Sequence, residues 1–411
     1  MKIKNFTKVC KFHKIPLQRI KLIESILSSK KGKLYLVGGV VRDLILKTNV
    51  SPVPDLVCDL PITTIVSLLK KNKIQFSSVG IDYGSIVIQY DFLRFDLTSM
   101  RKDLVSYGRH AEVSFSPNLD DDSARRDFTV NAIYCDTNGN IIDPQNGLKD
   151  LNRKKGPKIR FIGDTEERIK EDFLRILRFL RFSLYYSRTF DLVGLNSCKK
   201  FIKSIQKLSF ERRIGEAKKI IVLKNLESEF VIKKIYKFLE FCLDCKLNFK
   251  NFINLCLIEK KINDISFERR IKLLIRKKKI TKIKFVDYLE KKVKERITTN
   301  FKLVDFSENL VFYSLYKYPK EIVLDALIFG YLNKKISKKK LIFLVKGVKN
   351  FKLKDIPIDG NDLIRLGFKK GKIIGQLLDK TKKWWLKKNC LPNKKECESF
   401  VFSLFPTSRR R

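Results

Sequence analysis

Two hydrophobic periods alternate along residues 15–143. Apolar residues recur every three or four positions in three segments, and they alternate or form short unbroken runs in six others. The first pattern is typical of helices with one buried face, and the second is typical of strands. The predicted helices span 15–29, 41–46 and 62–71, and the predicted strands span 33–37, 55–58, 85–90, 93–99, 132–136 and 141–143. This mixture predicts a small α/β head, in which the polar segment 101–122 forms a mobile loop.

A different pattern begins after residue 148. Strand signals stop near Gly147, and from Glu166 onward the apolar positions keep helical spacing while basic residues occupy the other faces. We therefore predict an α+β fold, in which a small α/β head is followed by helices. The predicted domains are a head at 1–148, a helical neck at 149–225, a helical body at 226–300 and a helical tail at 301–411.

The chain carries a large excess of positive charge. Its 411 residues include 88 Lys and Arg against 44 Asp and Glu, a formal net charge of +44 at pH 7. Such a field favours polyanionic partners such as nucleic acids, although drift toward lysine in an AT-rich genome would also raise this count. No apolar run reaches the ~18–20 residues that span a bilayer, and the N-terminus lacks the apolar stretch of a signal peptide. We therefore expect a soluble cytoplasmic protein.

A glycine pair stands between a predicted strand and a predicted helix. Gly38 and Gly39 follow the strand at 33–37 and precede the helix at 41–46. Glycines at such a turn let the backbone approach a phosphate, and the helix N-terminus supplies N–H donors. Arg42, one turn into the helix, carries a fork of donors that suits a triphosphate. The segment predicts a phosphate-binding turn, although two glycines before a helix are often plain turn chemistry.

Candidate metal-binding carboxylates are present but incomplete. Phosphoryl transfer with two metal ions commonly uses acids at positions i and i+2 of one strand, plus a third acid on a neighbouring strand. Asp96 fits the third position, and Asp55 fits one member of the pair. The positions two residues before and after Asp55 are Val53 and Val57. Asp59 lies roughly 13 Å further along an extended strand, too far to share an ion with Asp55.

Three segments taken together resemble one enzyme family. They are Leu36–Asp43 (LVGGVVRD), Arg125–Ala132 (RRDFTVNA) and Glu171–Phe182 (EDFLRILRFLRF). In this order they resemble the bacterial-type (class II) tRNA nucleotidyltransferase and poly(A) polymerase family, over the chain up to about Glu216. The resemblance implies a polymerase-beta-like head with a mixed sheet, which adds nucleotides to RNA 3′ ends with Mg²⁺ as its cofactor.

The resemblance also implies roles for residues of the head. The family's D-x-D motif places its second acid at Asp55 and its first at Val53, so that Asp55 and Asp96 would be the catalytic and Mg²⁺-binding acids. Arg126 would contact the nucleotide, and Asp127 would orient the ribose or brace the strand. Because valine cannot ligate a metal, three interpretations stay open: a sequence error or recent lesion, a weakened enzyme with another oxygen ligand, or an inactive RNA-binding protein.

A second candidate site follows in the neck. Asp172 and Arg175 are three positions apart in a predicted helix, so we expect their side chains on one face. Asp accepts and Arg donates hydrogen bonds, so the pair matches the edges of cytosine and adenine better than that of uracil. An ordinary salt bridge is the alternative for an isolated pair. The resemblance implies that Asp172 and Arg175 read the base, while Arg178 and Arg181 reach the triphosphate or the incoming strand.

The helical rear offers fewer signals. Residues 357–375 predict a helix, a glycine turn and a second helix with N–H groups suited to a phosphate backbone. Trp384–Trp385 is predicted to anchor a core, and Arg269–Arg270 to lie on a solvated helix face. Together with these features, the resemblance implies the addition of CCA to tRNA from CTP and ATP, with the rear binding the acceptor and T arms. Poly(A) addition and a non-catalytic RNA-binding role are the alternatives.

Overall fold

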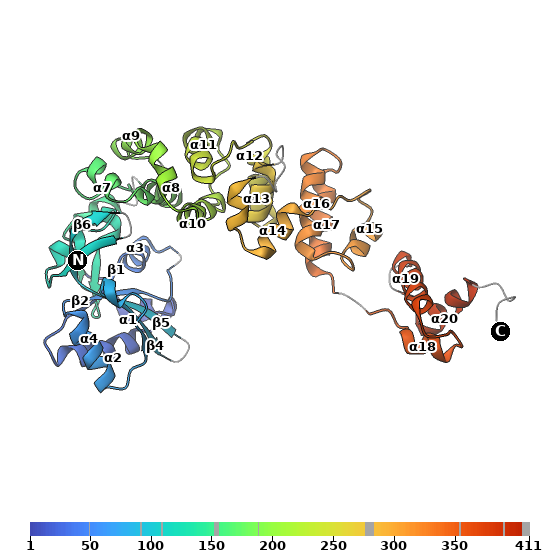
Figure 1. Cartoon of the computed structure of the whole chain (residues 1–411), viewed down its shortest axis with the longest axis horizontal. Helices are drawn as coiled ribbons and strands as arrows, with labels where there is room; N and C mark the ends of the chain where they lie inside the picture. The colour runs from blue at the N-terminus through green and yellow to red at the C-terminus, as the bar shows by residue number, and fades with distance from the viewer. Residues whose placement is uncertain are drawn as a thin grey trace. The chain divides into compact units, whose positions relative to one another are not determined.

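The computed structural model describes the chain except residues 49, 91–92, 108–109, 152–155, 188, 276–282, 353–354, 389–390 and 405–411, and it describes the backbone alone at 90, 93, 103–107 and 110–113. The described residues form two compact units (Figure 1). The first unit comprises 1–225 and 230–247, and the second comprises 226–229 and 248–411. The finer division into neck, body and tail remains a prediction. Among the described helices, none is both long and apolar enough to cross a membrane.

A seven-stranded mixed sheet forms the centre of the head. Its strands lie in the order β3-β4-β5-β2-β1-β8-β9, with β2 and β5 parallel and the other neighbours antiparallel. The strands are β1 (Leu34–Val37), β2 (Asp55–Cys58), β3 (Phe76–Ser77), β4 (Ser85–Tyr90), β5 (Leu93–Ser99), β8 (Tyr134–Asp136) and β9 (Ile141–Ile142). The bounds of β2, β4 and β5 are those that the hydrophobic pattern predicts, because each strand buries alternate or consecutive apolar residues in the sheet.

Three helices cover this sheet. They are α2 (Leu17–Ser28), α3 (Gly39–Leu46) and α4 (Ile62–Lys71). α3 contacts β1, α4 contacts β5, and α2 packs on α4. Ile20, Ile23 and Leu27 of α2 are buried because their spacing places them on one side of the helix. The helix predicted at 62–71 is confirmed over its whole length.

The segment 101–122 differs from its prediction. It contains β6 (Arg101–Tyr107) and β7 (His110–Phe115), which pair antiparallel as a separate two-stranded sheet. α5 (Leu119–Ala124) follows, and the side chain of Asn118 caps it by accepting from the N–H of Asp120 at 2.9 Å. The prediction of a loop is wrong because backbone hydrogen bonds and a helix cap form this structure, and a polar segment shows neither in its hydrophobic pattern.

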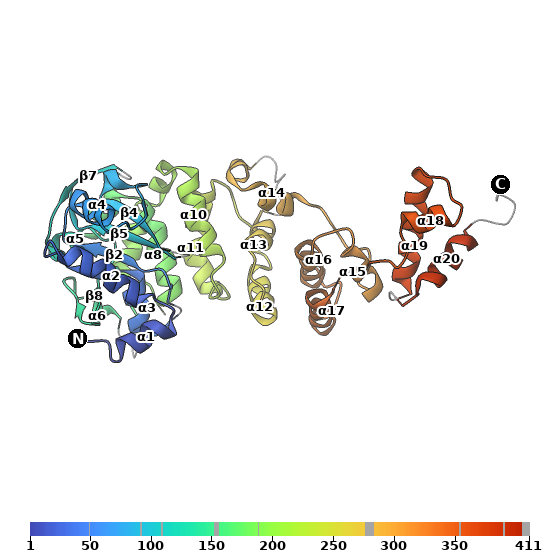
Figure 2. The ribbon, with the colours of Figure 1, turned by 90° about the horizontal axis from the view of Figure 1, so that it is seen from below.

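The rest of the first unit is helical. α10 packs against α8 (Figure 2). Both helices bury an apolar face. The helices are α1 (Phe6–Phe12), α6 (Gly147–Asp150), α7 (Thr165–Glu171), α8 (Leu174–Tyr186), α9 (Leu192–Lys200), α10 (Phe210–Ile221) and α11 (Glu229–Leu243), with short 3-10 turns at Ile81–Tyr83, Thr129–Asn131 and Ile202–Lys207. The predicted α+β fold, a mixed-sheet head followed by helices, is confirmed.

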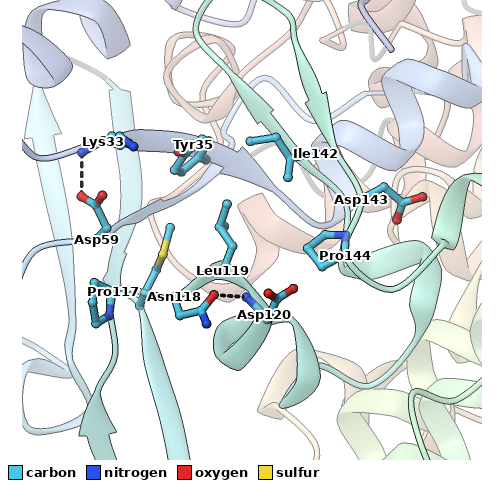
Figure 3. Close-up of a pocket in the computed structure, with 11 residues that line it drawn as sticks. Lys33, Tyr35, Asp59, Pro117, Asn118, Leu119, Asp120, Ile142, Asp143 and Pro144 are labelled. Atoms are coloured by element: carbon cyan, nitrogen blue, oxygen red, sulfur yellow. Dashed lines mark hydrogen bonds between the residues drawn. The ribbon is translucent and has the colours of Figure 1, made fainter.

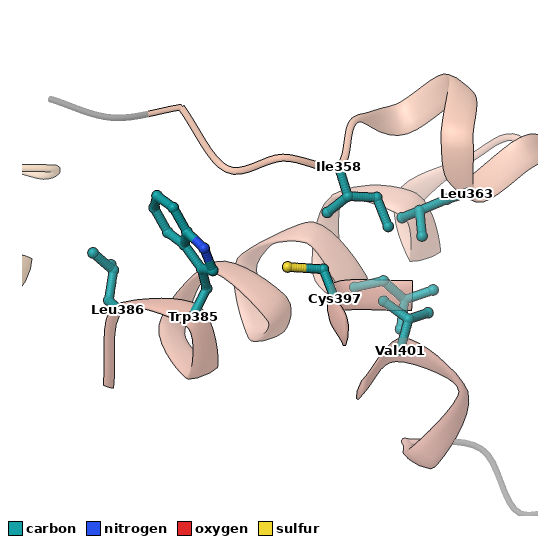
Figure 4. Packing of buried hydrophobic residues seen from close by; sticks show 7 residues of the cluster. Ile358, Leu363, Trp385, Leu386, Cys397 and Val401 are labelled. Carbon is teal, nitrogen blue, oxygen red and sulfur yellow. The ribbon is translucent and has the colours of Figure 1, made fainter. Parts of the chain in front are cut away.

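The second unit is helical throughout its described residues. Its elements are α12 (Phe252–Ile262), α13 (Phe267–Leu274), a 3-10 turn (Lys284–Tyr288), α14 (Lys291–Thr298), α15 (Glu308–Ser314), α16 (Lys320–Leu332), α17 (Lys338–Asn350), α18 (Gly360–Arg365), α19 (Lys372–Lys387) and α20 (Lys394–Ser403). Trp385 of α19 lies in a core with Ile358, Leu363, Cys397 and Val401 (Figure 4). Its indole Nε1 donates to the carbonyl of Pro392 at 2.8 Å. The predicted anchoring role is therefore confirmed for Trp385.

Arg269 and Arg270 on α13 are fully buried, so the prediction of a solvated face is wrong. Arg269 donates to Glu259 of α12 at 2.9 Å and to Asp325 of α16 at 2.7 Å, and Arg270 donates to Glu259 at 2.6 Å. Arg296 of α14 adds bonds of 2.9 Å to Asp325. Buried charges need such partners, and these lie up to 56 residues away from Arg269 in the sequence.

Candidate active site

The two predicted acids face each other across the centre of the sheet. Asp55 is the first residue of β2, and Asp96 lies in β5. The two strands are parallel, and Asp55 stands directly opposite Asp96 in the register. Neighbouring strands lie about 4.8 Å apart, and residues in register project from the same face. Both side chains are exposed to solvent. The sheet therefore brings the two carboxylates together, as the sequence predicted.

The two carboxylates also interact electrostatically. The pKa of Asp55 is raised above its usual value, first by the protein atoms that surround the carboxyl and then by the charge of Asp96. Arg126 and Arg178 act in the opposite direction and lower it. A divalent cation between the two carboxylates would relieve their repulsion. The pair is thus a candidate cation site with two arginines nearby.

Val53 lies outside the strand, in the loop that leads to Asp55. It is 40% exposed, stands between Pro52 and Pro54, and its N–H approaches Ser51 Oγ at 3.3 Å. Among the described residues, no three His, Cys, Asp or Glu side chains come together as a metal site. Mg²⁺ is commonly held by one or two carboxylates, with water and substrate phosphates completing its shell. Asp55 and Asp96 therefore fit a single Mg²⁺ ion, and among the described residues no third carboxylate joins them.

Gly38 connects the acids with the second motif. Its backbone has φ +71° and ψ −126°, a conformation that only glycine adopts readily. A Cβ built on Gly38 would lie 3.9 Å from Asp55 Oδ2, 3.8 Å from Arg126 Nη1 and 3.7 Å from the carbonyl oxygen of Asn131. Gly39 begins α3 directly after this turn. The predicted phosphate turn thus lies beside the acid pair.

Arg126 is held in place by groups that the sequence analysis missed. Its Nη2 donates to Asp122 Oδ2 at 2.9 Å, and its Nε donates to the hydroxyl of Tyr134 at 3.1 Å. Burial raises the pKa of Asp122, but Arg126 and Arg125 outweigh this and lower it to about 2. The signal in the sequence is that Asp122 stands three positions before Arg125 and four positions before Arg126. Asp122 and Tyr134 therefore orient Arg126, whose Nη1 is directed toward Gly38.

Asp127 links the head to the neck. Its Oδ1 accepts from the N–H of Phe128 at 2.9 Å and from Asn131 Nδ2 at 3.0 Å, and its Oδ2 accepts from Arg178 Nε at 2.6 Å. Burial alone would raise the pKa of Asp127, but Arg178 and Asn131 keep it below its usual value. The carboxylate therefore braces the chain and holds Arg178, while the terminal amino groups of Arg178 stay outside this pair.

Arg42 is arranged differently from the prediction of a triphosphate ligand. Only 4% of the residue is exposed. Its guanidinium donates two bonds to Asp43, at 3.0 and 3.2 Å, and one each to Asn131 Oδ1 and the hydroxyl of Tyr186. Four of the five N–H donors of an arginine are thus directed at protein groups. In this arrangement Arg42 joins α3 to α8 rather than presenting a free fork.

The predicted base-reading pair does not share one helix, and the expectation of a common helix face is wrong. α7 ends at Glu171, and Asp172 has an extended backbone before α8 begins at Leu174. In the turn that separates α7 from α8, Asp172 Oδ1 accepts from the N–H of Leu174 at 3.1 Å. The Asp-x-x-Arg spacing up to Arg175 therefore spans a turn between two helices.

Each member of this pair has a protein partner. Asp172 Oδ2 accepts from Arg212 Nη2 of α10 at 2.7 Å. Arg175 Nη1 donates to Glu171 and to the carbonyl of Arg168, the latter at 2.8 Å. Sequence analysis missed Arg212, whose only signal is a cation near the start of α10. Asp172 and Arg175 would have to exchange these partners to bind a base.

Arg181 lies further along α8, one turn after Arg178. Its Nε donates to Glu216 of α10 at 2.7 Å, and its guanidinium carbon lies 4.1 Å from the centre of the Phe182 ring. Arg178 approaches the same ring at 5.3 Å. The guanidinium groups of Arg178 and Arg181 therefore both lie against the ring of Phe182.

A separate pocket of about 470 Å³ lies elsewhere on the head (Figure 3). Tyr35, Met100 and Ile142 contribute to its lining, as does Asp59, which accepts from the N–H of Lys33 at 2.6 Å. The predicted site residues do not line this pocket. Asp59 is therefore tied to the backbone of a neighbouring strand and is not part of the acid pair.

The chain matches two family models and a set of known enzymes. Residues 34–156 match the poly A polymerase head domain, and residues 275–400 match a tRNA nucleotidyltransferase domain 2. The CCA-adding enzyme of Streptococcus uberis is 32% identical over 239 residues, which cover 56% of this chain and 57% of that protein. Human mitochondrial CCA tRNA nucleotidyltransferase 1 is 33% identical over 225 residues, 51% of this chain and 49% of that protein. The matched region thus spans about half the length of these relatives.

Solved structures share the fold over nearly the whole chain. The CCA-adding enzyme of Bacillus stearothermophilus in complex with CTP superposes with a TM-score of 0.68 at 19% identity, covering 95% of this chain and 98% of that one. The Thermotoga maritima CCA-adding enzyme complexed with tRNA superposes with a TM-score of 0.63 at 21% identity, covering 98% and 100%. At these identities the structures establish a common fold.

Proposed function

Because the chain belongs to the class II tRNA nucleotidyltransferase and poly(A) polymerase family, we propose that it adds CCA to the 3′ ends of tRNA, using CTP and ATP and releasing pyrophosphate. The observation that carries the proposal is the meeting of Asp55, Asp96 and Arg126 beside the Gly38 turn. Two carboxylates and a cation beside the turn that begins α3 are groups that the transfer of a nucleotidyl group uses.

The residues of the head would divide the work on the triphosphate. Asp55 and Asp96 would hold Mg²⁺, which when bound neutralises phosphate charge and favours ionisation of the attacking hydroxyl. Arg126 Nη1, which is directed at the Gly38 turn, would donate to a phosphate oxygen. The N-terminus of α3 at Gly39 would supply N–H donors. Asp127 would keep Arg178 at the edge of this space.

The neck would select the base. Asp172 and Arg175 present an acceptor and donors, and cytosine and adenine both carry an amino group that an acceptor can bind. Uracil presents oxygen at that place, so it would face the Asp172 carboxylate without a hydrogen bond. Since Arg212 and Glu171 hold the two side chains, base binding would exchange two ion pairs for hydrogen bonds to the nucleotide.

The tRNA partner is supported by charge and by the tail. The net charge of +44 attracts a polyanion. In the tail, Gly367 and Gly371 both have positive φ, and Gly371 directly precedes the N-terminus of α19, which also carries Lys372. Such a turn can approach a phosphate backbone closely. We propose that the helical rear binds the acceptor and T arms by shape and phosphate contacts. A cytoplasmic location remains a prediction.

Two alternatives remain. The match of residues 34–156 to the poly A polymerase head domain favours poly(A) addition as the second candidate within the family. Purified protein should be incubated with tRNA ending before CCA, with CTP, ATP or both, and the products resolved at single-nucleotide resolution. Addition of CCA and then arrest supports the proposal, whereas a long A tail or A-only addition contradicts it.

Val53 suggests the other alternative, a protein that binds RNA without catalysis. Restoring a carboxylate with Val53→Asp should increase the incorporation rate at low Mg²⁺, because a third oxygen ligand joins Asp55 and Asp96. The expected gain is about 10–100-fold, the usual effect of one ligand or its support on metal affinity or activity. Val53→Asn introduces a side chain of the same shape as aspartate but without its charge, so its incorporation rate should increase less. Wild type that is inert and becomes active only as Val53→Asp would establish the non-catalytic alternative.

A further inference from the structure

One face of α8 carries three side chains that meet the head. Arg178, Phe182 and Tyr186 are spaced four residues apart, so they follow one ridge of the helix. Phe182 is buried, and its ring centre lies 5.6 Å from that of Phe128 in the head. At the ends of the ridge, Arg178 and Tyr186 bind polar groups of the head. They are about 12 Å apart along the helix axis.

Tyr186, at the last turn of α8, binds the middle of α3 in three ways. Its hydroxyl donates to Asp43 Oδ1 at 2.8 Å, and it accepts from Arg42 Nη2. The guanidinium carbon of Arg42 also lies 4.2 Å from the centre of the tyrosine ring. The phenol thus serves as donor, acceptor and cation–π surface for one ion pair of the head.

Arg178 forms the second attachment, near the first turns of α8. Its Nε binds Asp127 at 2.6 Å, Asp127 binds Asn131 Nδ2 at 3.0 Å, and Asn131 Oδ1 accepts from Arg42. The two attachments are therefore joined through one chain of buried polar groups. A helix held at one point can pivot, whereas a helix held at two points about 12 Å apart keeps its direction.

We propose that Tyr186 is a positioning residue for base selection: its contacts with Arg42 and Asp43 fix the direction of α8, and so the place of Arg175 and Arg178 relative to the Gly38 turn. This inference rests on the proposed function. The neck can select the base only if the distance between Arg175 and the Gly38 turn of the head stays constant. Nothing in the family motifs identified above includes Tyr186; the contacts of this structure assign it.

The variant that tests this role is Tyr186→Phe, which keeps the ring and its contact with Arg42 but removes the hydroxyl. Tyr185→Phe is the matched control, because Tyr185 is the neighbouring residue, is 47% exposed and loses the same atom. Hydrogen–deuterium exchange of peptides covering 39–46 and 174–186 reports the attachment without any need for catalysis. Tyr186→Phe should raise exchange at the last turn of α8 about tenfold or more, because the variant loses the hydrogen bonds of the hydroxyl with two charged groups, Asp43 and Arg42.

The second measurement is the preference for CTP over UTP. In Tyr186→Phe the KM for CTP should rise and the CTP-to-UTP ratio of kcat/KM should fall about five- to tenfold, the range expected when a hydrogen bond of ~1–1.4 kcal/mol no longer favours one geometry. The melting temperature should fall by no more than a few degrees relative to Tyr185→Phe. Unchanged exchange in Tyr186→Phe overturns the attachment, and faster exchange with an unchanged CTP-to-UTP ratio overturns the positioning role.

If wild type adds no nucleotide to tRNA, the proposed function fails separately. The ratio is then taken from the dissociation constants of Mg²⁺–CTP and Mg²⁺–UTP measured by calorimetry. A smaller ratio in Tyr186→Phe than in wild type and Tyr185→Phe supports the positioning role. Equal ratios, or no binding of either nucleotide by wild type, overturn it.

Discussion

The two glycines of the phosphate turn should respond in opposite ways to the same substitution. Gly38 has φ +71° and ψ −126°, whereas Gly39 has an ordinary helical backbone as the first residue of α3. An L side chain at Gly38 would occupy a conformation that costs about 1–3 kcal/mol. At ~2 kcal/mol, the melting temperature of a unit of this size should fall by about 4–8 °C in Gly38→Ala.

Gly38→Ala should also weaken nucleotide binding. The new methyl group would lie 3.9 Å from Asp55 Oδ2 and 3.8 Å from Arg126 Nη1, in the space proposed for a phosphate. We expect KM for CTP and ATP to rise about tenfold or more, which corresponds to ~1.4 kcal/mol of binding energy. Nucleotide incorporation with tRNA lacking CCA, or calorimetry with Mg²⁺–CTP, measures this effect.

Gly39→Ala provides the control. Its Cβ would approach Arg42 Nη2 at 3.5 Å, an ordinary contact, so that the substitution should be neutral or stabilise by up to about 1 kcal/mol through the unfolded state. Thermal unfolding of both variants at one protein concentration makes the comparison. A Gly38→Ala variant with wild-type melting temperature and KM would refute the reasoning, as would equal destabilisation at Gly38 and Gly39.

Two further expectations concern buried charges. Arg126 and Arg125 lower the pKa of Asp122 to about 2 against the effect of burial. The contribution of this carboxylate to stability is therefore present above its unfolded pKa near 3.9, and it is lost as pH falls toward 2. Asp122→Asn should therefore cost about 2 kcal/mol at pH 7, with the difference from wild type vanishing near pH 2 in urea titrations; a difference that stays constant with pH contradicts this. Arg269→Met should cost about 3–5 kcal/mol, because it removes one of the two arginines that pair with each of the buried carboxylates Glu259 and Asp325. Lys260→Met, which removes an exposed ion pair, should cost less than ~1 kcal/mol by the same denaturant titration. Equal losses in these two variants would show that burial of the Arg269 network does not matter.

Local structure in the head could be predicted from the sequence because it depends on neighbouring residues. The strands at 55–58, 85–90 and 93–99 and the helix at 62–71 have the predicted bounds. Each is specified by a hydrophobic period within a few residues. The same holds for Trp385, whose size and apolar surface place it in a core. The motif residues likewise identified the family, because their types and order are specific.

Contacts between distant residues could not be read from local periodicity, and only the two-metal pattern and the family motif paired Asp55 with Asp96 in advance. Asp55 and Asp96 are 41 positions apart, and it is the parallel register of β2 and β5 that sets them opposite each other. Arg42 was expected to bind phosphate, yet Tyr186, 144 positions away, binds it within the protein. A side chain's type states which bonds it can make, but the tertiary structure decides which partner is within reach.

The sequence by itself therefore specified most elements of the head, the resemblance to one family, and a valine two positions before Asp55. The tertiary structure alone decided that Arg269 is buried, that Asp172 lies in a turn between two helices and pairs with Arg212, and that Tyr186 attaches α8 to α3. The physical reason is the range of the forces. Hydrophobic periodicity acts along the chain and is visible in it, whereas an ion pair depends on where folding brings two charges together.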